Sequence, residues 1–493
     1  MKFTGLDRFT ASFAPRWTLN RVRARMALDA VRNYEAARPG RRTSGWARSS
    51  GDANAVLAVA ISELRMHARD LIRNNSWARR GQRVIANNTV GWGIVPKANG
   101  GSSQAAGAIW KAWADSTQCD SEGRLSFSGI QSLVMKSIAS DGEILVRRRL
   151  RRPEDGLAIP LQLQVLEGDF LDTSKDGLIG IAGGPIRQGV EFDKLGRRAA
   201  YWLFSEHPGG LNSLPVSRRV PASEILHIFY TERPGQSRGV SWFGSAIANL
   251  KDLDEYEDAE LLKQKIAACF AAFVTDLDGA GTVGAEDPDD ETAEVLEPGM
   301  IQKLPPGKQV TFGNPPTVTE GNFANRNLRR IAAGLGVSYE DLTGDYSQVN
   351  FSSARMSRLA HWANVRDWQW NMLIPLLCNG VWGWAMEAAQ GVGLIQEAPS
   401  ADWTAPPMPM IEPDKEGLAY QRLVRNGVMT HADMVREQGG DPEAHWQEYS
   451  DGLKKLDELG IKLDSDVRAV SAAGLTQERV GGSGGKSGSS SNA

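Results

Sequence analysis

The spacing of apolar residues changes twice along this chain, and the two changes limit the folds open to it. After Asp52, a candidate helix N-cap, apolar residues recur at helical intervals: Leu57, Ile61, Leu64, Ala68 and Leu71. From Glu143 to Tyr230 the pattern becomes the alternation typical of short strands between Gly and Pro turns. Beyond Trp242 it is again mainly helical. A helical first part, a strand-rich middle and a helical last third predict an α+β fold.

The same patterns place the elements. The middle strands are expected in EILVRRRL, PLQLQVLE, GVEFD, AAYWLF and EILHIFY. Two of them form a hairpin that turns at Leu195–Gly196, and short strands also fit 300–312. Further helices are expected at 103–115, 128–140, 242–274, 321–336, 351–390 and within 415–475. No repeat of solenoid length is visible.

Composition excludes several classes of protein. The 493 residues contain three widely spaced cysteines and six dispersed histidines, so neither a disulfide framework nor a metal site is expected. The longest apolar run, IAACFAAFV, is too short to cross a bilayer, and the N-terminus lacks the apolar stretch of a secretion signal. The tail VGGSGGKS lacks the first glycine of a P-loop, so no nucleotide cofactor is expected.

Charge is distributed unevenly. The net charge is −3, yet residues 1–83 hold 17 Lys and Arg against 6 Asp and Glu, which leaves about +11 there and about −14 in the rest. Residues 266–302 contain nine acidic residues and no basic one. A protein that grips DNA along its whole length is normally basic overall, so tight capture of DNA by the whole chain is not expected.

Two charged helix faces are candidate contact surfaces. Arg65, Arg69 and Arg73 recur at four-residue intervals and form a basic stripe, which is either a solvated or salt-bridged face or a contact to an acidic neighbouring subunit or DNA. The carboxylates between Asp254 and Asp258 point around their helix instead of converging. They therefore predict a solvated or channel-facing surface, not an acid–base pair.

The stretch GDYSQVNFSSARMSRLAHW, 344–362, resembles a catalytic segment at first sight. A serine nucleophile needs a base within hydrogen-bond reach, but His361 lies about 12 Å along the expected helix from Ser352 and Ser353. Asn350 can instead cap that helix. The segment is therefore interpreted as a loop joined to a capped helix, and the protein is not expected to be an enzyme.

Taken together, ordered motifs across residues 40–450 resemble the lambda-type portal proteins of tailed phages. They include LRMHARDLIRNNSWARRG, NTVGWGIVP, ASDGEILVR, LQVLEGDFLD, EILHIFYTERPGQSRGVSW, EYEDAEL, LRRIAAGLGVSYEDLTGDYSQVNFSSAR and LVRNGVMTHADMVREQGGDPE. The resemblance implies a portal fold with a wing, a helical stem, a strand-containing clip and a helical C-terminal crown, assembled as a ring.

On this resemblance the chain divides into successive regions. They are a basic N-terminal arm (1–45), an N-terminal wing part (46–160), a strand-rich clip or wing region (161–235), a stem helix (236–275), an acidic loop with strands (276–320), a tunnel helix with channel loop and wing helix (321–400), a crown (401–475) and a disordered Gly/Ser tail (476–493).

The resemblance also implies roles for particular residues. In portals of this kind the segment before the helix at Phe351 projects into the channel. In this chain the segment comprises Asp345, Tyr346, Ser347, Gln348, Val349 and Asn350. Arg355, Arg358 and the stripe of Arg65, Arg69 and Arg73 would face the channel or a neighbouring subunit. The acidic stem face would be formed by Asp254, Glu255 and Asp258.

The implied function is that of a dodecameric ring at one capsid vertex, the conduit for DNA packaging and ejection and the attachment point of the tail. The implied partners are other copies of the chain, the terminase large subunit, the major capsid protein and scaffold, head-completion proteins and non-specifically bound double-stranded DNA. The implied location is the virion, with assembly in the host cytoplasm. Two alternatives remain: a nucleic-acid-binding structural protein with a basic arm, and a serine hydrolase.

Overall fold

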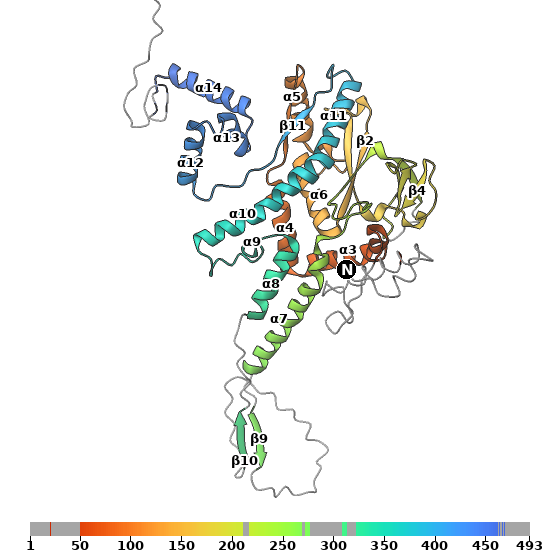
Figure 1. Cartoon of the computed structure of the whole chain (residues 1–493), viewed down its shortest axis with the longest axis vertical. Helices are drawn as coiled ribbons and strands as arrows, with labels where there is room; N and C mark the ends of the chain where they lie inside the picture. The colour runs from red at the N-terminus through yellow and green to blue at the C-terminus, as the bar shows by residue number, and fades with distance from the viewer. Residues whose placement is uncertain are drawn as a thin grey trace, which may run out of the picture. The chain divides into compact units, whose positions relative to one another are not determined.

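The computed structural model describes Asn20 and residues 50–210, 216–268, 272–276, 308–312 and 322–461, together with Leu463, Asp466 and Arg468. The chain divides into two compact units, Met1–Val56 and Leu57–Ala493. Most of the predicted basic arm, the acidic loop and the Gly/Ser tail lie outside the described residues. The described residues mix helices and sheets, as the α+β prediction requires (Figure 1). Among them, no helix has both the length and the apolar character needed to cross a membrane.

Helices of the N-terminal third and of the C-terminal half share one large hydrophobic core. Ile85, Ile130 and Leu373 are each fully buried in it, on three different helices. The N-terminal elements are α3 (Ala53–Asn74), α4 (Ser76–Val90), β1 (Val95–Ala98), α5 (Ser103–Ala114) and α6 (Phe127–Asp141). The helices predicted at 103–115 and 128–140 are thus confirmed to within a residue at each end.

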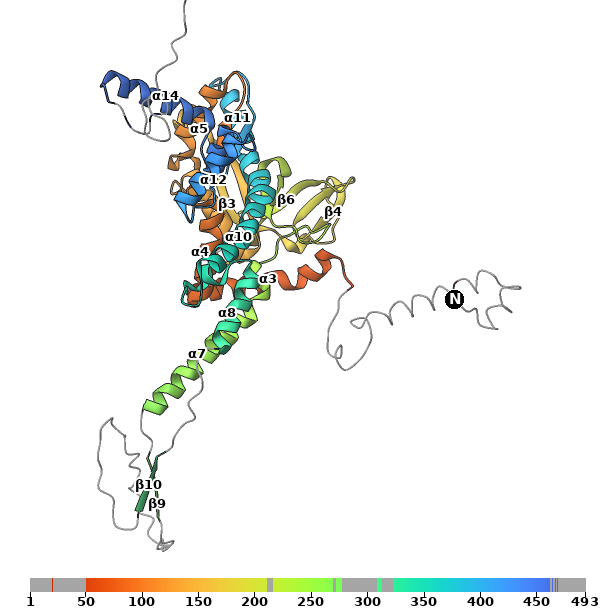
Figure 2. The ribbon, with the colours of Figure 1, turned by 60° about the vertical axis from the view of Figure 1, so that its left-hand side comes forward.

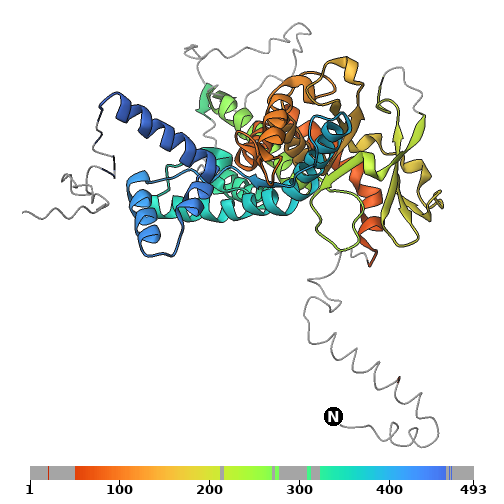
Figure 3. The ribbon, with the colours of Figure 1, turned by 90° about the horizontal axis from the view of Figure 1, so that it is seen from above.

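Two antiparallel sheets follow. The first has the order β3-β2-β8 and the second the order β4-β5-β6-β7. The strands of the second sheet, drawn in yellow to yellow-green, lie toward the right-hand side of Figures 1 and 3. Apolar side chains from both sheets form a second, smaller core between them, including Leu145, Leu203 and Val220. The strands are β2 (Glu143–Leu150), β3 (Leu161–Glu167), β4 (Gly183–Arg187), β5 (Val190–Asp193), β6 (Arg198–Phe204), β7 (Ser217–Pro221) and β8 (Ile225–Phe229). The predicted hairpin is the β5–β6 pair.

The helix predicted over 242–274 is too long at both ends. Trp242–Ser245 is a 3-10 turn, α7 spans Ile247–Ala268, and Ala272–Asp276 forms strand β9 paired with β10 (Lys308–Phe312). The residues AFVT have side chains that are common in strands, and pairing with the distant strand β10 stabilises the extended backbone here. The first half of α7 packs on α8 (Asn322–Leu335), which lies alongside it in Figures 1 and 2.

The long helix predicted over 351–390 is present but is not uniform. It consists of α10 (Phe351–Asp367), a π-helical segment (Trp368–Cys378) and α11 (Asn379–Gly391). Pro375 lies inside the π-helical segment. Because proline has no amide hydrogen and its ring crowds the preceding turn, a wider helical turn accommodates it.

After this helix the chain returns to its beginning. Strand β11 (Ala401–Thr404) pairs with β1, a contact between segments about three hundred residues apart. Three helices follow, α12 (Pro413–Arg425), α13 (His431–Glu437) and α14 (Pro442–Glu458). Lys97 of β1 lies 2.8 Å from a carboxylate oxygen of Asp441, so an ion pair also ties this C-terminal region to the first.

Candidate functional site

The segment between α9 (Tyr339–Thr343) and α10 is an exposed loop closed by helix caps at both ends. Gly344 ends α9 in the left-handed conformation, with φ 72°. Asn350 begins α10, because its side-chain oxygen accepts from the Ser353 amide at 2.8 Å while the Ser353 hydroxyl accepts from the Asn350 amide. The predicted N-cap is therefore confirmed as a full capping box.

The loop is held in shape from within. The Ser347 amide donates to a carboxylate oxygen of Asp345 at 2.9 Å, and the Tyr339 hydroxyl donates to the other oxygen. The bond from Ser347 lowers the pKa of Asp345 below its ordinary value. Tyr346 is 57% exposed, and Gln348 is also exposed. The loop thus presents two large uncharged polar side chains to solvent on a constrained backbone.

The histidine of this stretch has a structural contact. His361 is buried, and its Nδ1 lies 2.7 Å from a carboxylate oxygen of Asp341 on α9. Although burial opposes ionisation of Asp341, the bond to His361 lowers the pKa of that carboxyl. Ser353 uses its hydroxyl in the helix cap and Ser352 is exposed. The observed contacts give neither serine a histidine base.

The two arginines of α10 are only partly available to other molecules. Arg355 is 3.8 Å from a carboxylate oxygen of Glu416 on α12. Arg358 is half-buried, and its charge contributes to the lowered pKa of Asp341. Arg355 thus links α10 to α12, and a contact of either arginine with an anion stays a prediction.

The basic stripe of α3 divides into a buried and an exposed part. Arg65, 3% exposed, donates to Glu143 at 2.8 Å, and Arg69 donates to Asp141 at 2.6 Å. Both guanidinium groups are paired within the subunit, as the salt-bridged alternative expects, and the burial of Arg65 is at odds with a contact to a neighbour or DNA, whereas Arg69 stays 26% exposed. Arg73 remains exposed, 3.6 Å from Asp70.

Glu143 is the centre of a buried charged cluster that the sequence analysis did not single out. Its carboxylate is fully buried and accepts from Arg65, Arg238, the Gly239 amide and His227. Burial opposes ionisation, but the neighbouring charge of Arg238 holds the pKa of Glu143 well below its ordinary value. The only sequence signal was an acidic residue at the start of an otherwise apolar strand, EILV.

The acidic face of α7 is partly exposed. Asp254 accepts from the Asn75 amide group at 2.6 Å, which ties α7 to the start of α4. Glu255 and Asp258 are exposed, and Glu255 forms an i,i+4 pair with Lys251 at 3.7 Å. Two of the three predicted stem carboxylates are therefore exposed, although Lys251 offsets part of the charge of Glu255.

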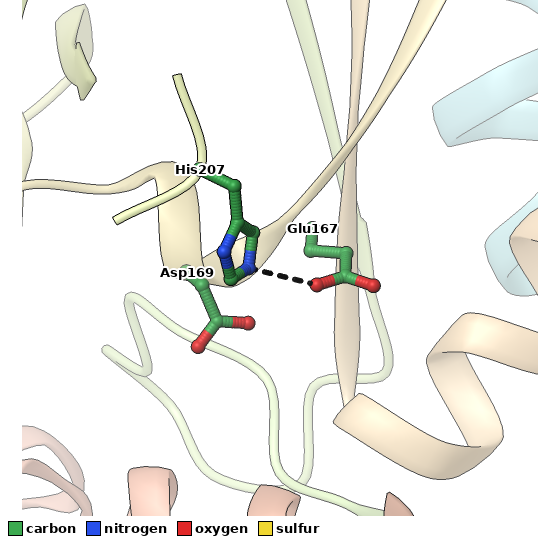
Figure 4. A group of neighbouring side chains, drawn as sticks. All are labelled: Glu167, Asp169 and His207. Carbon is green, nitrogen blue, oxygen red and sulfur yellow. Dashed lines mark ion pairs between the residues drawn. The ribbon is translucent and has the colours of Figure 1, made fainter. Parts of the chain in front are cut away.

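Three side chains come close to a metal-ligand arrangement. Glu167, Asp169 and His207 offer ligand atoms that lie within 4.8 Å of one another, and Figure 4 shows the His207 ring directed toward Glu167. However, a guanidinium nitrogen of Arg69 lies 2.9 Å from Glu167 and 2.7 Å from Asp169. Because Arg69 pairs with both carboxylates and Arg65 also lies 3.2 Å from Asp169, cations already occupy the place a metal ion would take, and the residues do not fit one.

Comparison with known proteins identifies the family. Residues 39–369 match the model of the phage portal proteins of the lambda family. The chain is 30% identical over 487 residues to a probable portal protein of Halomonas phage phiHAP-1, with 92% of each chain covered. This chain belongs to the lambda family of phage portal proteins. The resemblance seen in the ordered motifs is thereby confirmed.

Two other portal proteins are more distantly similar. The portal protein of Escherichia phage N15 is 26% identical over 369 residues, which cover 65% of this chain and 68% of the relative. Portal protein B of Escherichia phage lambda is 23% identical over 495 residues, which cover 88% of this chain and 91% of the relative. Among solved structures, a chain from the neck of a native gene transfer agent particle is 14% identical, with a TM-score of 0.46, covering 81% of this chain and 98% of that one. Family membership rests on the sequence matches.

Proposed function

We propose that this portal-family chain forms a dodecameric ring at one vertex of a tailed-phage capsid. The ring is the conduit through which terminase packages DNA and through which DNA later leaves, and it is the attachment point of the tail. The family match over 39–369 carries this proposal. The partners are further copies of the chain, the major capsid protein and scaffold, the terminase large subunit and head-completion proteins. The ring resides in the virion after assembly in the host cytoplasm.

Exposed leucines in the C-terminal half of α7 support assembly of the subunits into a ring. Leu250 and Leu253 are buried against the subunit's own core, whereas Leu261 and Leu262 are 51% and 59% exposed. Exposed apolar surface of this kind is a candidate for contact with another protein. Contact with the equivalent helix of a neighbouring subunit would cover them, as a stem made of several α7 helices requires.

The exposed carboxylates of α7 support passage of DNA without capture. Glu255 and Asp258 lie on the same element as the exposed leucines. In a ring, repetition of these charges produces a negative wall that repels phosphate, so that DNA slides instead of binding. In the loop from Asp345 to Asn350, Tyr346, Gln348 and Asn350 contribute uncharged contacts to the same channel. Arg355 and Arg358 lie at the base of this loop.

Imaging of the purified protein by negative-stain electron microscopy tests the proposal. A hollow ring of about twelve subunits is the expected result. Monomers under every condition, together with salt-sensitive duplex binding by the isolated subunit, would favour the basic-arm alternative. The hydrolase alternative requires a hydrolytic activity that disappears on Ser352→Ala or Ser353→Ala. Structural proteins of this family give no reason to expect one.

A further inference from the structure

A cavity of about 350 Å³ opens between the two sheets, where their shared apolar core ends. Its apolar floor includes Leu166, Leu203 and Val220, and these side chains also belong to that core. Its rim is basic. The rim arginines are Arg147, Arg149, Arg218 and Arg219, and we call the cavity the arginine cleft.

The positions of three of these arginines follow from strand geometry. Side chains two residues apart on a strand share a face. Arg147 and Arg149 therefore share the face of Leu145 on β2, and Arg218 shares the face of Val220 on β7. Leu145 and Val220 both lie in the core between the sheets. Arg147, Arg149 and Arg218 are therefore on the strand faces that point between the sheets, where the apolar core ends and the cavity opens.

The positive charge of the cleft is only partly balanced. Arg219 pairs with the buried carboxylate of Glu191, and Arg147 lies 3.7 Å from Glu224. Arg149 and Arg218 have no ion pair or hydrogen bond among the described residues. Two guanidinium groups at the mouth of one cavity are thus left without a counter-charge from the part of the chain that the structure describes.

Arg147 shows the effect of this imbalance. Burial, and then the neighbouring charge of Arg149, lower the pKa of its guanidinium group. Its Nε is buried without a hydrogen-bond acceptor in the described part of the chain. An uncompensated buried donor beside like charges is a costly arrangement that an added anion would relieve.

We infer that the arginine cleft binds an acidic peptide segment of a partner protein. Carboxylates of the segment would pair with Arg149 and Arg218, and an intervening apolar side chain would contact the floor. Strand β7 is an edge of its sheet, so an extended segment can also add main-chain hydrogen bonds. The apolar floor argues against duplex DNA, because the phosphates of a duplex have no apolar group to place there.

The inference is tested by fluorescence anisotropy with the full-length protein. The probe is a fluorescein-labelled synthetic peptide in which Glu alternates with Leu, and the matched probe carries Gln in place of every Glu. The decisive variant is R149Q/R218Q. Neither arginine side chain has a partner within the described ranges, so this variant is expected to keep the wild-type melting temperature. The control variant is R197Q, since Arg197 is 75% exposed at the β5–β6 turn, outside the cleft.

Wild type and R197Q are expected to bind the Glu peptide equally, and R149Q/R218Q about tenfold more weakly or not at all. The Gln peptide should bind none of them well. Absence of binding by wild type, or equal binding by wild type and R149Q/R218Q, would overturn the inference. So would selective loss of duplex DNA binding in R149Q/R218Q without any peptide binding, because the cleft would then be a nucleic-acid contact.

Discussion

Glu143 joins three separate parts of the chain at the residue scale: Arg65 from α3, His227 from β8 and Arg238 from the segment that leads to α7. Replacing Glu143 with Gln would leave the two arginines buried without their shared counter-charge. The free energy of unfolding should fall by roughly 3–5 kcal/mol, measured by chemical denaturation. Glu255→Gln, which removes an exposed i,i+4 pair, should change it by less than about 0.5 kcal/mol. Equal effects of the two substitutions would refute a structural role for the cluster.

The same cluster makes stability depend on pH. Burial lowers the pKa of His227 below its ordinary 6.5. As the pH falls below 6.5, this histidine is protonated in the unfolded chain while it stays neutral in the folded chain, so the free energy of unfolding decreases. Glu143, whose pKa is depressed mainly by Arg238 against the effect of burial, adds a second loss below its ordinary 4.5. His227→Gln, which retains a donor but does not titrate, should flatten the loss between pH 7 and 5. The exposed His67→Gln should keep the wild-type slope, and a wild-type slope in His227→Gln would assign the effect to other groups.

Sequence distance explains which residue contacts could be foreseen. The Asn350 cap joins residues three positions apart, and its residue types alone predict it. The partner of Arg65 lies 78 positions away and that of Arg69 72 or more, so the stripe was visible but its neutralising carboxylates were not. Ion pairs between distant segments follow from the fold and cannot be read from local spacing.

At the element scale, the start of α10 depends on its capping box. Asn350→Ala and Ser353→Ala each remove one of the two reciprocal bonds and should lower the free energy of unfolding by about 1 kcal/mol. Ser352→Ala, at an exposed neighbouring position, should change it by only a few tenths. Thermal denaturation of the three variants distinguishes them. A larger effect of Ser352→Ala than of Ser353→Ala would contradict the assigned cap.

The junction between α6 and β2 depends on Gly142. It ends α6 with φ 89°, and a Cβ at this position would lie 2.2 Å from the Val240 carbonyl carbon and 2.5 Å from the Ser241 amide nitrogen. Gly142→Ala should therefore destabilise the protein by more than about 3 kcal/mol or prevent its folding. Gly123 also has a positive φ but open space around it, so Gly123→Ala should cost about 1 kcal/mol. If both variants have similar soluble yields and melting temperatures, the backbone at Val240 can move to accommodate a Cβ atom at position 142.

Periodicity predicted elements well where one face packs on a continuous core, as for α5, α6 and the long helix after Asn350. It was wrong for Ala272–Asp276, because a short segment with three apolar residues next to a helix fits either state until its partner strand is known. It missed β1 and β11, each four residues long and paired across most of the chain. The π-helical segment was not foreseen, since Pro375 alone does not distinguish a kink from a wider turn.

At the scale of the whole molecule, two surfaces of the subunit are incomplete for different reasons. The C-terminal half of α7 exposes Leu261 and Leu262, which follow Asp258 by three and four residues, so apolar and acidic side chains share one face that a neighbouring copy could cover in part. The arginine cleft has surplus positive charge in a recess, which suits a small acidic segment and not a second rigid surface. Ring assembly and peptide binding should therefore be separable, so R149Q/R218Q is expected to form rings.

The loop before α10 provides the last whole-molecule prediction. Because Gly344 ends one helix and Asn350 caps the next, shortening the segment 345–349 reduces the projection while retaining both capping residues. Rings should still form by electron microscopy, whereas the yield of particles that package and retain DNA should fall severalfold when the variant is the only portal supplied during phage growth. The reason is that Tyr346 and Gln348 would no longer reach the DNA. Normal DNA content in such particles would refute a channel role for the loop, and failure of ring assembly would instead assign the loop to contacts between subunits.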